Sequence, residues 1–295
     1  MFVLVFGATG FVGLPVAQAL VRAGHNVYGQ TRSQEKAALL VKEEITPIVC
    51  APDSDAWHHL VPTLDVVIDA VGGTDVRALS QALFAATAAA AARLRPAGAP
   101  RLSYIYSSGT WVHGERRRAA PASDTTPLAA PNALVAWRPD AERRVREGAV
   151  LNGIVVRPAL VYGRGGSLFA PLFKSARAGR AVWPGRPGGC LALVHADDLA
   201  DLYVRVAERA PALGGLAFDA VNGVSEATDA MLERLVAVSG AGGYEYKEPE
   251  NSFEEAIASS AVLRPYLARS LLGWVPKKAG LTDNMEVHYN ASIAA

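Results

Sequence analysis

Three glycines, Gly7, Gly10 and Gly13, stand at even spacing near the start of the 295-residue chain. They directly follow an apolar run at positions 2–6 and come just before a helix-like segment at 14–23. Between a strand and a helix, glycines permit a tight turn and a close approach of the backbone to a pyrophosphate. The N–H groups and dipole at the helix start also favour phosphate. The pattern predicts a dinucleotide site whose contacts are Gly7, Thr9, Gly10, Phe11, Val12 and Gly13.

The end of the second expected strand, at positions 26–31, indicates which nicotinamide dinucleotide is preferred. NAD sites place an acidic residue there for the ribose 2′-hydroxyl, whereas an arginine accommodates a 2′-phosphate. This strand ends in Thr31, Arg32 and Ser33, and the first acidic residue is Glu35. Hydroxyls and a guanidinium suit a phosphate, so NADP(H) is favoured over NAD(H). The alternative is that Arg32 is an ordinary surface cation.

The elements that must position these residues alternate between strand and helix. Such alternation is typical of a parallel sheet covered on both faces, and three of the strands are unbroken apolar runs. We therefore expect an α/β Rossmann fold with a doubly wound parallel sheet at 1–162. Residues 163–295 are expected to form mainly a small substrate-capping lobe, with 194–222 returning near the sheet. The expected strands are 2–6, 26–31, 48–50, 66–70, 102–106 and 154–157, and the expected helices are 14–23, 33–41 and 76–94.

Composition excludes several kinds of partner. The formal net charge of +1 gives no field of one sign that would attract nucleic acid or anionic lipid. The two cysteines, Cys50 and Cys190, have neither a disulfide framework nor metal-ligand spacing. No apolar stretch has the length of a membrane span. We expect a cytoplasmic protein with a small-molecule substrate and with no metal, nucleic acid or membrane partner.

Motifs along most of the chain resemble those of the extended and atypical short-chain dehydrogenase/reductases of the NAD-dependent epimerase/dehydratase type. The similar segments are the glycine run and residues 65–70, 104–108, 156–163, 193–200 and 271–276. The resemblance implies that Asp53 contacts the adenine amine. It implies further cofactor contacts at Ala70, Val71, Gly72, Ser107 and Pro158. It also implies a possible homodimer formed through the alanine-rich helix and the helix around Arg138.

The catalytic residues of that family are absent. There a tyrosine transfers the proton, a lysine four residues later lowers its pKa, and a serine or threonine shares the substrate oxygen. This sequence has no Tyr-x-x-x-Lys. The resemblance aligns Gly109 with the family's serine, Leu134 with its tyrosine and Arg138 with its lysine. Arg138 keeps the charge, but it cannot be deprotonated.

Other side chains are candidates for the missing roles. Ser108 and Thr110 follow the fifth strand, at the edge where such a sheet binds its ligand, and Arg138 can hold ribose or substrate. Ser107 has a similar place, and the alternative is that it contacts the cofactor or the backbone. For Thr110 the alternative is an ordinary turn residue. His113 has a suitable pKa for acid–base work. Pro139 predicts that the helix around Arg138 either is broken or begins there.

Three functions remain open from the sequence. The first is an NADP(H)-dependent reductase or dehydrogenase that acts on a small organic carbonyl or alcohol with a non-standard active site. The second is a non-redox isomerase, lyase or cyclase on the same scaffold. The third is a non-catalytic sensor that binds the cofactor and a protein partner.

Overall fold

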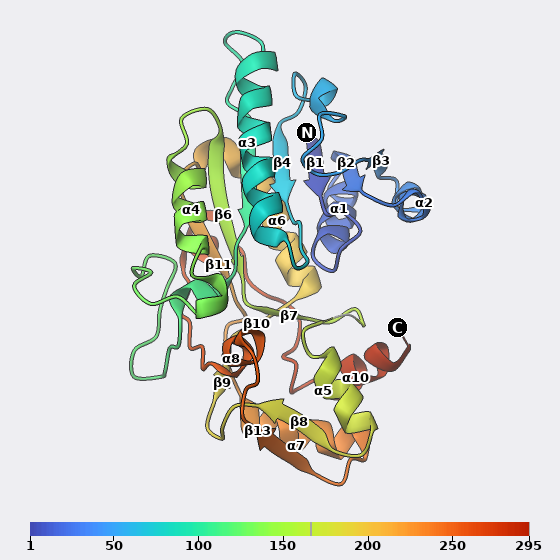
Figure 1. The fold of residues 1–295 in the computed structure, drawn as a ribbon, viewed down its shortest axis with the longest axis vertical. Coiled ribbons are helices and arrows are strands. Elements are labelled where there is room, and N and C mark those ends of the chain that lie inside the picture. Colours follow the sequence, from blue (N-terminus) through green and yellow to red (C-terminus); the bar gives the residue numbers. More distant parts are fainter. Residues whose placement is uncertain (166, 295) are drawn as a thin grey trace. The chain divides into compact units, whose positions relative to one another are not determined.

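The computed structural model describes residues 1–165 and 167–294. Its central feature is a seven-stranded sheet (Figure 1). The adjacent pairs β1–β2, β2–β3, β1–β4, β4–β5 and β5–β6 are all parallel. This arrangement confirms the predicted Rossmann-like fold. The strand order is β11 (Ala217–Ala220), β6 (Asn152–Pro158), β5 (Ser103–Ser107), β4 (Val66–Asp69), β1 (Phe2–Phe6), β2 (Asn26–Thr31) and β3 (Thr46–Val49).

The central strands are apolar because helices cover the sheet on both faces. Four of the five residues of β1 and all four of β4 are buried. In the register, Val3 of β1 lies between Val27 and Val66, and Val66 in turn faces Ser103. Unbroken runs of Val, Ile and Leu are what a doubly covered parallel sheet requires.

Five helices accompany these strands, and four of them, α1 to α4, lie where the sequence predicts a helix. They are α1 (Gly13–Arg22), α2 (Gln34–Lys42), α3 (Val76–Leu94), α4 (Arg138–Glu147) and α6 (Ala196–Arg209). The alanine-rich α3 buries Leu83, Ala90 and Ala91, so the alanine run is a packed helix. The side chain of Ser33 caps α2 by accepting a hydrogen bond from the Lys36 N–H, which starts that helix one residue later than expected.

The chain divides into two compact units, each built from three separate segments. Unit 1 consists of Met1–Ser108, Asp140–Arg157 and Ala200–Phe218, whereas unit 2 consists of Gly109–Pro139, Pro158–Leu199 and Asp219–Ala295. Unit 1 contains most of the central sheet.

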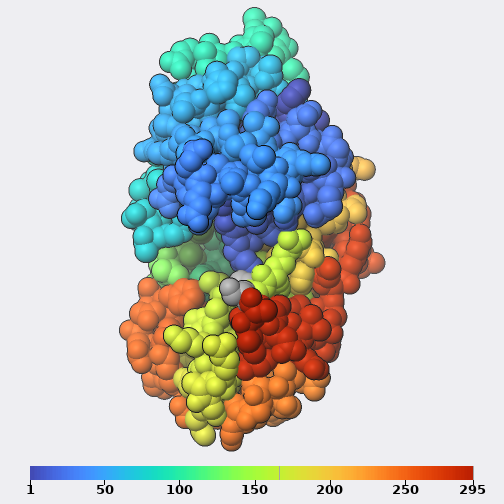
Figure 2. Space-filling view, turned by 90° about the vertical axis from the view of Figure 1, so that its right-hand side faces the viewer, coloured from blue at the N-terminus to red at the C-terminus, as the bar shows by residue number. Residues whose placement is uncertain are grey.

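Unit 2 is a mixture of short strands and helices around its own aromatic core. Phe169 stacks on Trp183 with the ring centroids 5.7 Å apart, and Leu232 and Leu235 are buried in the same cluster. Figure 2 shows the surface of α10 beside that of α5, and the two helices are in contact. The remaining elements are β7 (Leu160–Tyr162), α5 (Ala170–Arg177), β8 (Ala181–Pro184), β9 (Cys190–Leu191), β10 (Leu193–His195), β12 (Glu226–Ala227), α7 (Thr228–Ser239), β13 (Tyr244–Lys247), α8 (Ser252–Ala258), α9 (Leu267–Leu272) and α10 (Met285–Ala294).

Among the described residues, no helix has both the length and the apolar character needed to cross a membrane. No cluster of three or more His, Cys, Asp or Glu side chains within the same residues has the geometry of a metal site.

Candidate functional site

The loop between β1 and α1 is folded so tightly that it has no room for side chains at its glycines. Gly7 has a φ of +71°, and a Cβ there would lie 2.5 Å from the carbonyl oxygen of Ala70. A Cβ on Gly13 would lie 2.1 Å from the carbonyl oxygen of Gly7. The N–H of Gly10 donates to that same oxygen at 2.9 Å. A Cβ on Gly10 would lie 3.1 Å from that oxygen, which is tight, whereas Gly7 and Gly13 require glycine, as expected for a phosphate-binding turn.

The start of α1 is left available for an anion. Val12, which precedes the helix, makes no side-chain capping hydrogen bond, and the first turn has no acidic residue. Gly10 is exposed, while Thr9, Phe11 and Val12 are half-buried. The N-terminal N–H groups of a helix require acceptors, and the positive end of the dipole favours negative charge. The turn and the helix start thus fit the pyrophosphate of a dinucleotide.

Gln30 holds this loop in place, and the sequence analysis missed it. Its side-chain oxygen accepts a hydrogen bond from the Gly7 N–H at 3.1 Å, and its side-chain nitrogen donates to the Cys50 carbonyl at 2.6 Å. Gln30 is only 2% exposed. An amide at a position expected to be buried in a central strand is the signal that would have found it, because such groups need hydrogen-bond partners.

The residues predicted to bind the 2′-phosphate meet at the start of α2. The hydroxyl of Thr31 accepts from the Ser33 N–H at 3.3 Å, and Ser33 caps the helix. Arg32 lies between them and is exposed. Within the described part of the chain, no carboxylate lies within ion-pair distance of Arg32. Its guanidinium is therefore available to an anionic ligand.

The structure brings only some of the other predicted cofactor contacts to the glycine loop. Ala70 and Val71 lie against Gly7, and the Val71 N–H donates a hydrogen bond to the Asp69 carboxylate at 3.1 Å. Gly72 and Asp53 are exposed, in the loops that follow β4 and β3. Pro158, at the end of β6, belongs to unit 2 and not to the unit that contains the loop.

Ser107 is the last residue of β5 and Ser108 follows it, and the two serines have different surroundings. The Ser107 hydroxyl lies 2.5 Å from the hydroxyl of Tyr203 on α6, and Tyr203 is fully buried. The backbone N–H of Ser108 donates to the Val156 carbonyl at 2.8 Å. The Ser108 hydroxyl is buried and has no partner among the described residues. An unsatisfied buried hydroxyl costs about 1–3 kcal/mol, so a ligand oxygen would be favoured there.

The three positions that the resemblance assigned to the missing catalytic residues lie in unit 2. Gly109 is extended, with a φ of 175°, and a Cβ there would meet its nearest neighbour, the Pro158 carbonyl oxygen, at an ordinary 3.8 Å. Thr110 is buried in a short 3-10 helix, Thr110–His113. Leu134 lies in another, Ala133–Val135. The guanidinium of Arg138 stacks over the Trp137 ring at 4.8 Å.

Pro139 lies in the first turn of α4, which begins at Arg138. Of the two sequence-based alternatives, the helix therefore begins at this point and is not broken by the proline. A proline in the first turn leaves no hydrogen bond unmade, because the N–H groups there have no partners within the helix. Leu134 and Arg138 consequently lie on different helices and do not share one helical face.

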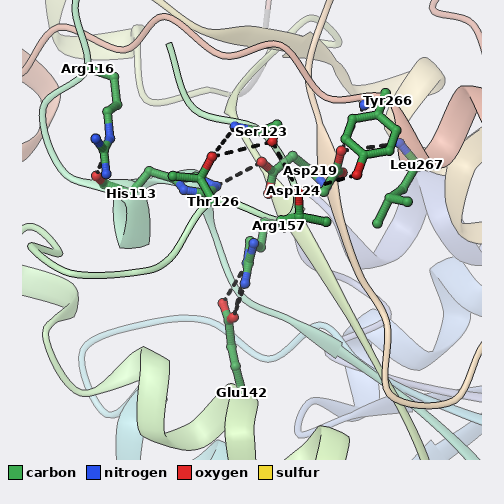
Figure 3. Close-up of polar contacts among 11 residues, drawn as sticks. His113, Arg116, Ser123, Asp124, Thr126, Glu142, Arg157, Asp219, Tyr266 and Leu267 are labelled. Carbon is green, nitrogen blue, oxygen red and sulfur yellow. Dashed lines mark hydrogen bonds and ion pairs between the residues drawn. The ribbon is translucent and has the colours of Figure 1, made fainter. Parts of the chain in front are cut away.

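His113 is part of a buried structural network and does not fit the role of acid–base catalyst. Its Nε2 lies 2.8 Å from a carboxylate oxygen of Asp219, and both side chains are fully buried. The Asp219 N–H donates to Asp124, which also accepts from the Tyr266 and Leu267 N–H groups (Figure 3). The ring is thus held between segments of unit 2, out of contact with solvent.

Unit 2 contains a hollow of about 640 Å³ that is lined by charged residues of both signs. Arg117 pairs with Glu115 at 2.9 Å, and Arg186 lies 3.5 Å from Glu248. The positive charge of these two arginines is therefore already partly balanced.

The sequence profile of the NAD dependent epimerase/dehydratase family matches residues 3–216. The chain belongs to this family. It is also 27% identical to an uncharacterized protein of Schizosaccharomyces pombe over 225 residues, which are 71% of each chain.

Solved structures of epimerases and dehydratases share the fold. The dTDP-glucose 4,6-dehydratase of Bacillus anthracis, in complex with NAD, has a TM-score of 0.81 and 12% identity, with 100% of this chain and 97% of that chain covered. The UDP-glucuronic acid 4-epimerase of Bacillus cereus, in complex with UDP-glucuronic acid and NAD, has a TM-score of 0.79 and 17% identity, with coverage of 100% and 99%.

Proposed function

We propose that this family member binds NADP(H) and acts as a reductase or dehydrogenase on a small organic carbonyl or alcohol. The observation that carries the proposal is the glycine loop, where a Cβ on Gly7 or Gly13 would overlap the backbone, next to an uncapped helix start. The names of the dehydratase and epimerase with the same fold include bound NAD, which supports a nicotinamide dinucleotide. Bound cofactor would supply or accept the hydride.

The choice of NADP(H) rests on the start of α2. Arg32 is exposed and has no carboxylate partner among the described residues, while the Ser33 hydroxyl accepts from Lys36 and keeps its own proton to donate. A guanidinium forms bidentate, charge-assisted hydrogen bonds with phosphate. No acidic side chain stands at the end of β2 to take a ribose hydroxyl. This arrangement suits a 2′-phosphate better than a free hydroxyl.

Reduction of a carbonyl also requires a proton, and Tyr203 with Ser107 could supply it in place of the missing tyrosine. When Tyr203 donates to the Ser107 oxygen across 2.5 Å, the Ser107 proton is directed toward another acceptor. Proton transfer from Ser107 to the substrate oxygen and from Tyr203 to Ser107 would leave a phenolate. Because Tyr203 is fully buried, a proton from solvent would return to it through the half-buried Ser107 hydroxyl after the product leaves. The Ser108 hydroxyl would hold the same substrate oxygen.

A fluorescence titration with NADPH, NADP⁺, NADH and NAD⁺ tests the cofactor assignment. We expect NADPH to bind at least tenfold more tightly than NADH. The Arg32→Ala variant should lose most of that difference, whereas Lys36→Ala, which removes another exposed cation near the start of α2, should keep it. Equal effects of Arg32→Ala on NADPH and NADH would exclude the 2′-phosphate assignment, and failure of all four to bind would exclude the function.

Cofactor absorbance in the presence of aldehydes, ketones and enones then tests turnover. Where a substrate is reduced, Tyr203→Phe should lower kcat about 100-fold or more, the size of a typical general-acid contribution. Tyr104→Phe is the matched control, because this buried tyrosine hydroxyl donates to Asp69 instead. NADPH binding without turnover of any compound would favour the non-redox enzyme or the sensor. Equal kcat in Tyr203→Phe and wild type would exclude the proton route.

A further inference from the structure

Unit 2 contains a second hollow, of about 210 Å³, and none of its lining residues is used in the proposed function. Three segments line it: 219–223 after β11, 263–269 around the start of α9, and 274–276 beyond that helix. The walls include Pro265, Pro276 and the buried Trp274. A hollow of this size suits a ligand smaller than a typical drug molecule.

Buried carboxylates hold these three walls in place. Asp124 accepts hydrogen bonds from the N–H groups of Asp219, Tyr266 and Leu267, and so joins the first two segments (Figure 3). Asp198 accepts from the Lys277 and Lys278 N–H groups, while its backbone carbonyl accepts from the Trp274 indole. A recess fixed in this way exists before the ligand arrives, which lowers the entropic cost of binding.

One lining residue, Asn222, has a buried hydrogen-bond acceptor to which no described residue donates. Asn222 is 7% exposed, and its side-chain nitrogen donates to the Tyr162 hydroxyl at 3.1 Å. Its side-chain oxygen is buried without a partner among the described residues. Because a buried polar atom in this state costs about 1–3 kcal/mol, a ligand hydroxyl or N–H placed against it would be favoured.

Two exposed arginines, Arg264 and Arg269, complete the lining. Within the described residues, neither guanidinium is within ion-pair distance of a carboxylate. They differ in this from Arg117 and Arg186 in the larger hollow. The one acidic lining residue, Asp219, is fully buried and already bonded to His113. The charge available to a ligand is therefore positive.

We infer that this recess, formed by 219–223, 263–269 and 274–276, is a separate binding site for a small organic carboxylate that carries a hydroxyl on an apolar body. The carboxylate binds Arg264 and Arg269, the hydroxyl donates to the Asn222 oxygen, and the apolar body packs against Pro265 and Pro276. The carboxylate and the hydroxyl of the ligand thus meet lining groups that have no partner in the part of the chain that the structure describes.

Calorimetry with 4-hydroxybenzoate tests the site on the full chain without dinucleotide. Benzoate lacks the hydroxyl and 4-hydroxybenzyl alcohol lacks the charge, so each should bind at least tenfold more weakly. In a ¹H–¹⁵N spectrum the indole N–H signal of Trp274 should shift on binding, which places the probe in the recess. Failure of 4-hydroxybenzoate to bind, or binding without a shift at Trp274, would overturn the inference.

A second experiment replaces the two arginines of the recess, because exposed arginines can be replaced without disturbing the fold. The double variant Arg264→Gln/Arg269→Gln should lose at least tenfold in affinity for 4-hydroxybenzoate. Arg234→Gln is the matched control: it removes another exposed arginine of unit 2, from α7, and should bind as wild type does. Equal affinity in the double variant and the control would overturn the site. The same variants are also titrated with dinucleotide, so that failure of this site can be told apart from failure of the proposed function.

Discussion

The guanidinium of Arg157 lies against the carboxylate of Glu142 inside unit 1, with Nη2 2.6 Å from Oε2 and both side chains only 2% exposed (Figure 3). The Arg157 Nε also donates to this carboxylate, at 3.1 and 3.0 Å. The pair joins α4 to β6. Breaking a buried pair costs more than an exposed pair contributes, because one charge is left without compensation.

Glu142→Ala should therefore destabilise the protein by about 3–5 kcal/mol in urea unfolding. The Glu142→Met/Arg157→Met double variant should regain most of that loss, since no uncompensated charge remains. Asp140→Ala breaks the exposed Arg143–Asp140 pair, which is 2.9 Å apart, and should cost at most about 1 kcal/mol. A similar loss in Glu142→Ala and Asp140→Ala would contradict the assigned role of the buried pair.

Gly13→Ala should destabilise the fold by about 1–3 kcal/mol or more, because its Cβ would lie 2.1 Å from the Gly7 carbonyl oxygen and force the loop to move. It should also weaken dinucleotide binding. Gly72→Ala is the control for stability: a Cβ there has no neighbour within 4 Å, so the unfolding free energy should stay within about 0.5 kcal/mol of wild type. Equal thermal unfolding of the two variants would show that the Gly7–Gly13 contact is not tight.

The sheet and the glycine loop could be predicted because both depend on short-range pattern. The apolar runs that become β1 and β4 are buried on both faces, and the glycine spacing needs only a strand before it and a helix after it. Pro139 was informative for the same reason: its missing N–H predicted either a broken helix or a helix start, and the structure shows that α4 begins at Arg138.

Contacts between distant residues could not be predicted in this way. Gln30 holds Gly7 across 23 residues, and Tyr203 meets Ser107 across 96. Neither partner follows from local periodicity, because each depends on which strand or helix packs beside the site. The open acceptor on Asn222 also became visible only when its surroundings were known. The composition of each unit from three separate segments could not be predicted either, because it depends on contacts between residues that are far apart in the sequence.

His113→Phe should lower the unfolding free energy by about 3–5 kcal/mol, since it removes the ring donor 2.8 Å from the buried Asp219 carboxylate. Asp219→Asn should cost less, because an amide oxygen still accepts from the ring and no charge is left buried. His59→Gln replaces an exposed histidine and should be neutral. If His113→Phe kept wild-type stability but lost activity, the structural role given to this ring would be wrong.

Unit 2 should lose stability in mild acid because of His288 on α10. Its ring lies edge-on to Tyr162 and near His195, with centroid separations of 5.0 and 5.7 Å. Burial, with the nearby His195 and Lys278, lowers the pKa of His288 from 6.5 to about 4. Burial also lowers the pKa of His195. The unfolded chain therefore binds these protons first, so stability present above about pH 6.5 is lost as the pH falls toward 4.

For His288 alone the loss is on the order of 3 kcal/mol. The unfolding free energy measured in urea at pH 7.5, 6.0, 5.0 and 4.5 should fall steeply for wild type. His288→Phe keeps an aromatic ring against Tyr162 but cannot bind a proton, so its free energy should fall less over the same range. His59→Gln, which removes an exposed histidine, should follow the wild-type curve. Parallel curves for wild type and His288→Phe would mean that the His288 proton does not cause the loss of stability in mild acid.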